Sequence, residues 1–418
     1  METSRWVGAR SVAGRKVLRR VRRFLQRFQL YLWVREVLSA VRQVTHQFHG
    51  GVVSLHTAGA AKGNVLISYD NEGLLCKMRG VAIPTSHPQL YKTMAMAQTY
   101  LDLGYDVDVI HCENHKFIPW KSYDVIVDTR FNLQRLRPYL PSGCIKILHC
   151  DTAHIIYQNL AEMVRIQNLQ RRKGVTIPPN RLETPHLGVE HADYLTTCGN
   201  EFTTNTYTYA NKPIFRLPMV VQKMWPWPDD KDFEASRRRF LWFGSRGMVH
   251  KGLDIVLEAF IQMPEYQLTI IGPVLEEPQF VDLYRKELFH TRNIHFVGWV
   301  DNVDEEFGKI LKQNVAHVFA SCSEAGAAAV LETMAGGVIP IVTYESSIDV
   351  KSFGVLLEDA TVESVMHRVR EIAAMSREQL LKMSKRAWEC AHSNHTPEKF
   401  EHAYRAVIEM LLAKHGKG

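Results

Sequence analysis

Two alternating patterns of hydrophobic and polar positions run along most of the chain, and together they predict an α/β protein. From Gly51 onward, short β-branched runs alternate with longer stretches in which apolar residues recur every three or four positions. Such alternation is typical of an open parallel sheet covered by helices. In the first half, strands are expected at 64–68, 107–110, 123–127, 145–149 and 192–197, and a helix over 90–103.

A proline-rich stretch between residues 211 and 230 separates this pattern from a second one of the same kind. Its prolines, Pro213, Pro218, Pro226 and Pro228, predict an interdomain connection without regular elements. Beyond it, strands are expected at 240–243, 267–271, 293–296, 316–320 and 339–343, with helices starting near Lys251, Asp304 and Ala327. We therefore expect two Rossmann-like domains that face a cleft, residues 51–215 and 216–395, and a C-terminal helix over 396–418.

The first 50 residues depart from this pattern and predict a basic amphipathic helical arm. They hold eleven Lys and Arg and two Asp and Glu, a net charge of +9, which leaves −2 of the total of +7 for the other 368 residues. A nearly neutral body is not expected to bind nucleic acid. Within 15–48, Val17, Val21, Phe24 and Phe28 recur at helical spacing, and arginines occupy the complementary positions.

This arm is typical of a helix that lies on a membrane surface. Each Lys or Arg near an anionic leaflet contributes about 1 kcal/mol, and the apolar face adds to that attraction. Basic amphipathic helices also bind partner proteins or pack on their own body, and these remain the alternatives. The apolar runs near the start are far shorter than the roughly 18 residues of a spanning helix, so we expect neither a transmembrane segment nor a secretory signal.

The cysteines bear on the compartment. All seven are scattered, with no C-x-x-C pair, which favours a reducing compartment. Together with the basic arm, this predicts a cytoplasmic protein held peripherally on the inner face of the cell membrane.

A glycine-rich turn with two cations follows the first strand of the second domain. It reads from Gly244 through Ser245, Arg246 and Lys251 to Gly252. Glycines let backbone amides approach an anion, and the helix start adds its positive dipole end. The turn therefore suits a diphosphate, although a glycine-rich turn by itself is as often a simple connector.

Two glutamates stand eight positions apart after the strand at 316–320. Glu324 lies in the loop before the helix and Glu332 on it, and the residues just after Glu324 are small: Ala325, Gly326, Ala327 and Ala328. Small side chains leave backbone amides open to a sugar or phosphate. One carboxylate would then orient sugar hydroxyls and the other a ribose diol, whereas two unrelated glutamates would be a dipole-stabilised and a surface residue.

In combination, these motifs resemble family 4 retaining glycosyltransferases of the GT-B fold, the glycosyl transferases group 1 type. The Glu-x7-Glu pair and the glycine-rich turn with its Lys-Gly end match the family, as do the strand ends at Gly272 and Val297, in the right order over 240–343. The chain departs from the family at Ser245, where an arginine is usual. The resemblance implies that Lys251 and Arg246 hold the donor diphosphate, with the backbone around Gly244 and Ala325–Ala328. Glu332 would then hold the ribose and Glu324 the transferred sugar.

Acceptor-side residues are weaker candidates. The family commonly places a histidine after a strand of the first domain, which favours His154 as a catalytic residue, with His149 as the alternate and Asp151 beside them. His87 lies where many members carry a glycine-rich acceptor loop, without the paired glycines. Asp106-Val107-Asp108 is a D-x-D triplet, but it sits inside a strand pattern, so we expect a structural role and no metal site.

The sequence thus predicts a metal-independent, cofactor-free enzyme that moves a sugar from a nucleoside-diphosphate donor to a glycan or lipid-linked acceptor in cell-envelope polysaccharide or glycolipid synthesis. The resemblance implies retention of configuration through a front-face reaction. A nucleotide-sugar epimerase of the same fold and a non-catalytic scaffold are the alternatives. The sugar, the base and the acceptor do not follow from the sequence.

Overall fold

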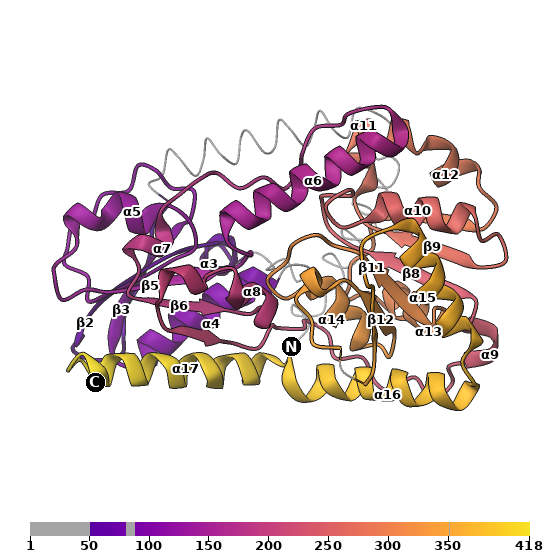
Figure 1. The fold of residues 1–418 in the computed structure, drawn as a ribbon. Coiled ribbons are helices and arrows are strands. Elements are labelled where there is room, and N and C mark those ends of the chain that lie inside the picture. Colours follow the sequence, from indigo (N-terminus) through magenta and orange to yellow (C-terminus); the bar gives the residue numbers. More distant parts are fainter. Residues whose placement is uncertain (1–50, 81–87, 351) are drawn as a thin grey trace. The chain divides into compact units, whose positions relative to one another are not determined.

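The structure, a computed structural model, describes residues 51–80, 88–350 and 352–418. The expected basic arm, including its helix at 15–48, and His87 lie outside the described residues. Residues 52–418 form one compact unit built on two sheets (Figure 1). We call the part from β1 to β7, together with α17, the first lobe, and the part from α9 to α16 the second lobe.

The first lobe has a seven-stranded sheet in the order β1-β3-β2-β4-β5-β6-β7. Its strands are β1 (Val53–Leu55), β2 (Gly63–Tyr69), β3 (Tyr105–His111), β4 (Val125–Asp128), β5 (Ile145–Cys150), β6 (Tyr194–Thr197) and β7 (Ile214–Arg216). Only the edge strand β1 is antiparallel to its neighbour within this sheet. The helices are α3 (Glu72–Met78), α4 (Pro88–Asp102), α5 (Asn132–Leu136), α6 (Ile155–Lys173), α7 (Gly188–His191) and α8 (Glu201–Asn205).

The second lobe has a six-stranded, fully parallel sheet in the order β10-β9-β8-β11-β12-β13. Its strands are β8 (Arg239–Phe243), β9 (Gln267–Ile271), β10 (Ile294–Gly298), β11 (Ala316–Phe319), β12 (Ile339–Val342) and β13 (Val355–Leu356). The helices are α9 (Phe233–Ser236), α10 (Leu253–Ile261), α11 (Pro278–Leu283), α12 (Arg285–His290), α13 (Glu305–Gln313), α14 (Ala328–Met334), α15 (Val362–Ala374) and α16 (Arg377–Asn394). Parallel sheets are covered on both faces, and β11 and β12 accordingly are buried along their whole length.

The proline-rich stretch is not wholly irregular, contrary to the prediction. Strand β7 begins directly after Pro213 and pairs with β6 at the edge of the first sheet. Proline is tolerated at the start of an edge strand because only one side of the strand needs hydrogen bonds. The three-residue strand is too short to stand out from the surrounding prolines in the sequence.

The D-x-D triplet lies within β3, and its carboxylates are bound by protein groups. The Asp108 side chain is fully buried and accepts hydrogen bonds from Ser54 Oγ at 2.7 Å and Tyr123 Oη at 2.5 Å. Asp106 accepts from the Thr57 backbone amide at 3.0 Å and contacts His56 Nδ1 at 2.9 Å. These bonds tie β1 and the segment after it to β3, which is a structural role.

Two long helices link the lobes in opposite directions (Figure 1). Helix α17 (Pro397–Lys414) follows α16 but buries Phe400, Tyr404 and Ile408 in the core of the first lobe, against α4. Helix α6 starts after β5 of the first lobe, yet Ile166 and Leu169 pack in the core of the second lobe. The lobes therefore share core residues and are not joined by the connecting segment alone.

Candidate active site

A cavity of about 330 Å³ is lined by both lobes at the carboxyl ends of their strands. The first lobe contributes the start of α4 and the residues after β4 and β5. The second lobe contributes the loops after β8 and β11 and the start of α14. This is where ligands bind in open α/β sheets, since the strand ends leave their loops and helix starts free to contact a ligand.

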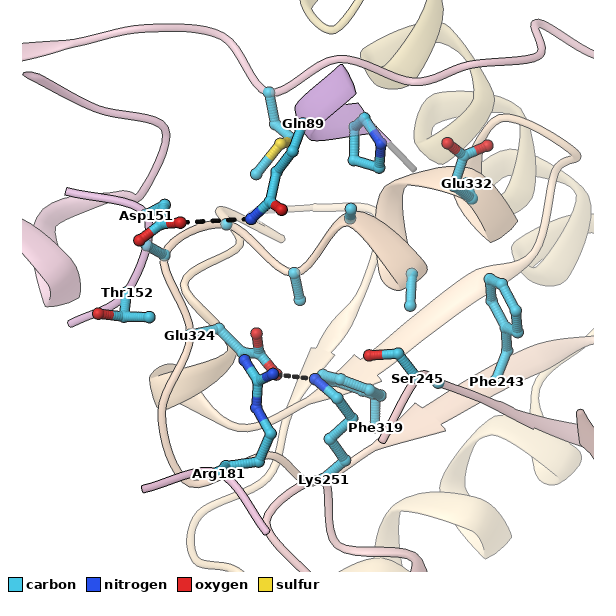
Figure 2. A pocket seen from close by; sticks show the side chains of 18 of the residues that line it. Gln89, Asp151, Thr152, Arg181, Phe243, Ser245, Lys251, Phe319, Glu324 and Glu332 are labelled. Atoms are coloured by element: carbon cyan, nitrogen blue, oxygen red, sulfur yellow. Dashed lines mark hydrogen bonds and ion pairs between the residues drawn. The ribbon is translucent and has the colours of Figure 1, made fainter. Parts of the chain in front are cut away.

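Lys251 and Glu324 form an ion pair inside the cavity (Figure 2). Lys251 Nζ lies 2.5 Å from Glu324 Oε1, which also accepts a hydrogen bond from Ser321 Oγ at 3.0 Å. Burial lowers the pKa of Lys251, and the glutamate opposes that effect in part. Burial by itself would raise the pKa of Glu324. The positive charges of Lys251, His250 and Arg181 outweigh burial and hold the pKa of this carboxyl below its usual value.

Glu332 lies on α14 at another part of the cavity lining (Figure 2). Its side chain is buried, and Oε1 accepts a hydrogen bond from the Gln222 backbone amide at 3.0 Å. Oε2 is buried with no hydrogen-bond partner among the residues that the structure describes. Burial raises the pKa of Glu332 to about 8, although hydrogen bonds from the Gln222 and Lys223 backbone lower it in part.

The loop between the two glutamates is shaped by its small residues. Gly326 has a φ of +84°, and a Cβ there would lie 2.7 Å from the carbonyl oxygen of Cys198 in the first lobe, so only glycine fits. The Ala327 amide donates to the carbonyl of Ser346 and is not open to a ligand, contrary to the sequence expectation. The amides of Ala328 and Ala329 have no acceptor within the described part of the chain.

Behind this loop lies a buried network that joins α6 to the second lobe. His250 Nε2 contacts the Ser323 carbonyl at 2.8 Å, and its Nδ1 lies 3.7 Å from Glu162 Oε2 on α6. Burial disfavours the imidazolium, but Cys322, Glu162 and Glu324 favour it and raise the pKa of His250 to about 9. The network therefore places a cationic histidine beside the loop that carries Glu324.

The first-lobe face of the cavity has its charges largely paired. Arg130 forms ion pairs with Asp151 and, at 3.2 Å, with Glu183. Gln89 Nε2 donates to the second Asp151 oxygen at 3.3 Å (Figure 2). Lys92 also lines the cavity and lies beside the fully buried His149, which borders no part of it.

The structure brings most of the sequence-predicted residues together. The cavity is lined by Gly244, Ser245, Lys251, Glu324, Ala325, Gly326, Ala327, Ala328, Glu332 and Asp151. Arg246 is not among the lining residues, because its guanidinium pairs with Glu276 at 3.1 Å. Gly272 and Val297 do not line it either. A Cβ on Gly272 would lie 2.5 Å from the Gly244 carbonyl oxygen, so Gly272 serves the close approach of β8 and β9.

The two predicted histidines lie outside the cavity lining. His154 caps α6 by accepting from the Ile156 amide, and its Nε2 lies 3.0 Å from the Tyr209 hydroxyl. His149 sits between Lys92 and Thr196, and burial together with the Lys92 charge lowers its pKa to about 3. Both rings are therefore engaged by protein groups.

Sequence reasoning missed the cavity residues Gln89, Lys92, Arg130, Arg181 and Glu183. None of them belongs to a glycine-rich turn or a paired-carboxylate motif. Arg181 follows Pro178-Pro179-Asn180, where the prolines mark the end of a helical segment. That signal shows a turn but not which lobe the turn faces.

Comparisons with known proteins agree with this architecture. Residues 229–389 match the family model described as Glycosyl transferases group 1. No curated protein matches the sequence. Among solved structures, the chain is similar to sucrose-phosphate synthase from Thermosynechococcus elongatus, with 14% identity, a TM-score of 0.58, and coverage of 84% of this chain and 99% of that one.

Two further structures are similar over most of both chains. One is Anabaena HepE in complex with UDP and glucose, with 11% identity, a TM-score of 0.53, and coverage of 84% and 99%. The other is WaaG, a glycosyltransferase involved in lipopolysaccharide biosynthesis, with 13% identity, a TM-score of 0.50, and coverage of 81% and 98%. The chain spans only 54% of another matched structure, that of a mutant of S. aureus TarM.

Proposed function

We propose that this chain, which has the GT-B fold and a second lobe that matches glycosyl transferases group 1, is a retaining, metal-independent glycosyltransferase. It transfers a sugar from a nucleoside-diphosphate donor to a glycan or lipid-linked acceptor. The donor lies against the second lobe, and the acceptor enters from the first.

One observation carries the proposal. In each of the two cavity glutamates, one carboxylate oxygen is hydrogen-bonded to protein groups, and the other has no hydrogen-bond partner among the described residues. Glu324 Oε1 is bound by Lys251 and Ser321, while its Oε2 has no hydrogen bond within the described residues. Glu332 Oε1 is bound by a backbone amide, while Oε2 is buried without a partner in the same described ranges. A buried acceptor left unsatisfied costs about 1–3 kcal/mol, which hydroxyl donors of a ligand can offset.

Both glutamates line the same cavity, and we assign them to the two ends of a nucleotide sugar. Glu332 forms a hydrogen bond with the ribose diol through Oε2, and Glu324 accepts hydrogen bonds from hydroxyls of the transferred sugar. The diphosphate lies between them, at Lys251 and the open amides of Ala328 and Ala329. Fixed donors there stabilise the charge that develops on the leaving diphosphate.

The reaction exchanges one glycosidic bond for another on the same face of the sugar. The bond from the anomeric carbon to the diphosphate oxygen breaks, and a bond to the acceptor hydroxyl oxygen forms. The acceptor proton passes to the leaving diphosphate oxygen, so no protein base is needed. In this proposal, the cations that line the cavity serve the diphosphate in place of a metal ion.

A thermal-shift screen against UDP, GDP, ADP and TDP, with and without EDTA, tests the donor class. A ligand of the folded state adds about 2.7 kcal/mol to stability at a hundredfold excess over Kd. We expect one base to shift the unfolding temperature selectively and EDTA to leave the shift unchanged. Absence of any shift, or a shift that EDTA abolishes, contradicts the proposal.

Product analysis tests the reaction. NMR of the anomeric proton is expected to show the same configuration in donor and product. An inverted product overturns the retaining mechanism. Conversion of the sugar in a donor-only incubation favours the epimerase alternative instead.

We also propose that the acceptor belongs to cell-envelope polysaccharide or glycolipid synthesis, with the protein held on the cytoplasmic face of the membrane by residues 15–48. The support is the basic amphipathic pattern of that segment and the fold shared with WaaG. No helix in the described ranges is long and apolar enough to cross a bilayer. Flotation with anionic liposomes is expected to carry the full chain, and equal flotation of a chain that lacks residues 1–49 contradicts this role.

A further inference from the structure

Among the described residues of the glycine-rich turn, Lys251 is the only cation that lines the cavity. Lys251 lines the cavity, but Ser245 occupies the position directly after Gly244, and the Arg246 guanidinium pairs with Glu276 outside the lining. A nucleoside diphosphate carries at least two negative charges next to the bond that breaks. One ammonium already paired with Glu324 leaves that charge incompletely balanced.

Arg181 supplies a second cation at the same place, although it belongs to the segment after α6. It lines the cavity, and in Figure 2 its guanidinium points toward Glu324 and the Lys251 ammonium. Its stem lies on the turn itself, since a Cβ added to Gly247 would come within 2.5 Å of Arg181 Cγ. Its Nε is buried and has no hydrogen-bond partner in the part of the chain that the structure describes.

The backbone that carries Arg181 is fixed to α6. Glu162 Oε1 accepts hydrogen bonds from the amides of Asn180 and Arg181, at 2.7 and 2.8 Å. Gln158 Nε2 donates to the Arg181 carbonyl at 3.1 Å. Asn159 bonds both the amide and the carbonyl of Glu183, at 2.8 and 2.9 Å. We call residues 180–183 the strap.

The strap is in turn held against the second lobe. Glu162 faces His250 of the glycine-rich turn, and Arg165 on α6 donates to the carbonyl of Ala320 after β11. Arg172, near the end of α6, pairs with Asp254 and Glu258 on α10. These contacts hold the backbone of the strap over the turn before any ligand binds, so that this segment need not be ordered on binding.

Resting on the proposed function, we propose that Arg181 of the strap is the second cation of the donor diphosphate subsite, in place of an arginine in the glycine-rich turn. Its planar fork binds two phosphate oxygens at once, while Lys251 acts as a point charge on the other side. Donor binding thereby depends on α6, a first-lobe helix packed on the second lobe.

Isothermal titration of the full chain with inorganic pyrophosphate, UDP, GDP, ADP and TDP tests this assignment. Arg181→Ala is expected to weaken pyrophosphate binding, and that of the nucleotide that binds the wild type, by roughly 10- to 100-fold. Arg181→Lys is expected to restore part of the affinity because it keeps the charge without the fork. Arg246→Ala is the matched control, since it removes an arginine two residues from Gly244 that does not line the cavity, and it is expected to change affinity less than threefold.

The possible outcomes separate the inference from the function on which it rests. Lys251→Ala is titrated in parallel. Weaker binding in Lys251→Ala with unchanged binding in Arg181→Ala overturns the inference and leaves the proposed function standing, as does a larger loss in Arg246→Ala than in Arg181→Ala. Failure of every ligand to bind the wild type overturns both. Unfolding temperatures without ligand are measured for each variant, and Arg181→Gln replaces Arg181→Ala if the latter does not fold.

Discussion

Each lobe has a lysine that lines the cavity and a buried histidine next to it. The pKa values of the two histidines are shifted in opposite directions. In the first lobe, Lys92 lies against His149, and burial together with the lysine charge lowers the pKa of this histidine to about 3. In the second lobe, His250 precedes Lys251 in the chain, and its pKa rises to about 9 despite burial. At neutral pH, His149 is therefore neutral and His250 is protonated.

The groups that surround each histidine explain this difference. In the first lobe, Asp151 is bound by Arg130 and Gln89, so Lys92 is the dominant charge acting on His149. In the second lobe, Cys322, Glu162 and Glu324 all act on His250 and raise its pKa. The second lobe therefore gathers positive charge behind the place proposed for the diphosphate. Apart from Lys92 and from Arg181 of the strap, the first lobe lines the cavity with paired charges and polar groups, which suit the hydroxyls of a sugar acceptor.

The largest effect is expected from Glu324→Gln. This change keeps the shape of the side chain but removes the carboxylate that holds Lys251 and that is proposed to orient the sugar. Turnover is expected to fall about 100- to 1000-fold, the scale of losing one preorganised interaction in a transition state. Steady-state kinetics with the identified donor measure it. A rate within threefold of the wild type, in a variant that folds normally, removes Glu324 from the catalytic site.

A smaller effect should distinguish the two lysines. Lys251→Met is expected to weaken nucleoside-diphosphate binding by about 100-fold, because a charge-assisted contact is lost and Glu324 is left unpaired. Lys92→Met removes the matching lysine of the first lobe and is expected to leave that binding within threefold. Isothermal titration of both variants with the same nucleotide makes the comparison. Equal losses would mean that the two faces do not divide donor from acceptor.

The second lobe could be predicted well because its signals are local. Strand, glycine-rich turn and helix follow one another within 239–261, and Gly252 is required there because a Cβ would lie 2.5 Å from the Ala320 carbonyl oxygen. Lys251, Glu324 and Glu332 could be named because their motifs together resemble a known family, and all three line the cavity. The three-residue strands β1 and β7 could not, since so few residues show no periodicity.

Residues whose position depends on distant partners escaped prediction. Arg246 is turned away by Glu276, thirty positions further along, and nothing near Arg246 indicates that pairing. Arg181 reaches the cavity only because α6 leaves the first lobe and packs on the second. The pKa values of His149 and His250 depend on burial and on groups of other elements, such as Lys92 for the first and Cys322 and Glu162 for the second. Sequence spacing alone therefore cannot assign them.

Glu332→Gln is expected to change stability in a pH-dependent way. The pKa of Glu332 is about 8 in the fold, and that of an unfolded glutamate is about 4.3. The folded state therefore keeps a proton that the unfolded state releases. Proton binding by Glu332 thus contributes to the free energy of unfolding. The contribution is complete below the unfolded pKa and is lost as the pH rises through about 8.

Glu332→Gln has no titratable group at this position, so the variant does not lose this stability as the pH rises. Its unfolding temperature relative to the wild type is expected to be higher by a few degrees at pH 9 than at pH 5. Thermal unfolding across this range measures the difference. A constant difference between the two pH values would mean that Glu332 is ionised in the ligand-free protein and that its buried oxygen is satisfied in another way.

The smallest effects come from the histidine pair and lie in opposite pH windows. The raised pKa of His250 contributes stability that is complete below the unfolded pKa of about 6.5 and is lost as the pH rises through about 9. The lowered pKa of His149 contributes stability that is present above about 6.5 and is lost as the pH falls toward about 3. Either slope amounts to at most about 1.4 kcal/mol per pH unit.

His250→Gln should therefore flatten the stability profile only between pH 6.5 and 9, and His149→Gln only between pH 6.5 and 3. Urea unfolding at closely spaced pH values measures both slopes, each read as the difference from the wild type, because Lys231 and Glu332 also titrate in the alkaline window. Flattening in the same window for both variants would show that the two lobes do not hold their histidines in opposite charge states. The second lobe would then lack the extra positive charge on which its role in binding the diphosphate partly rests.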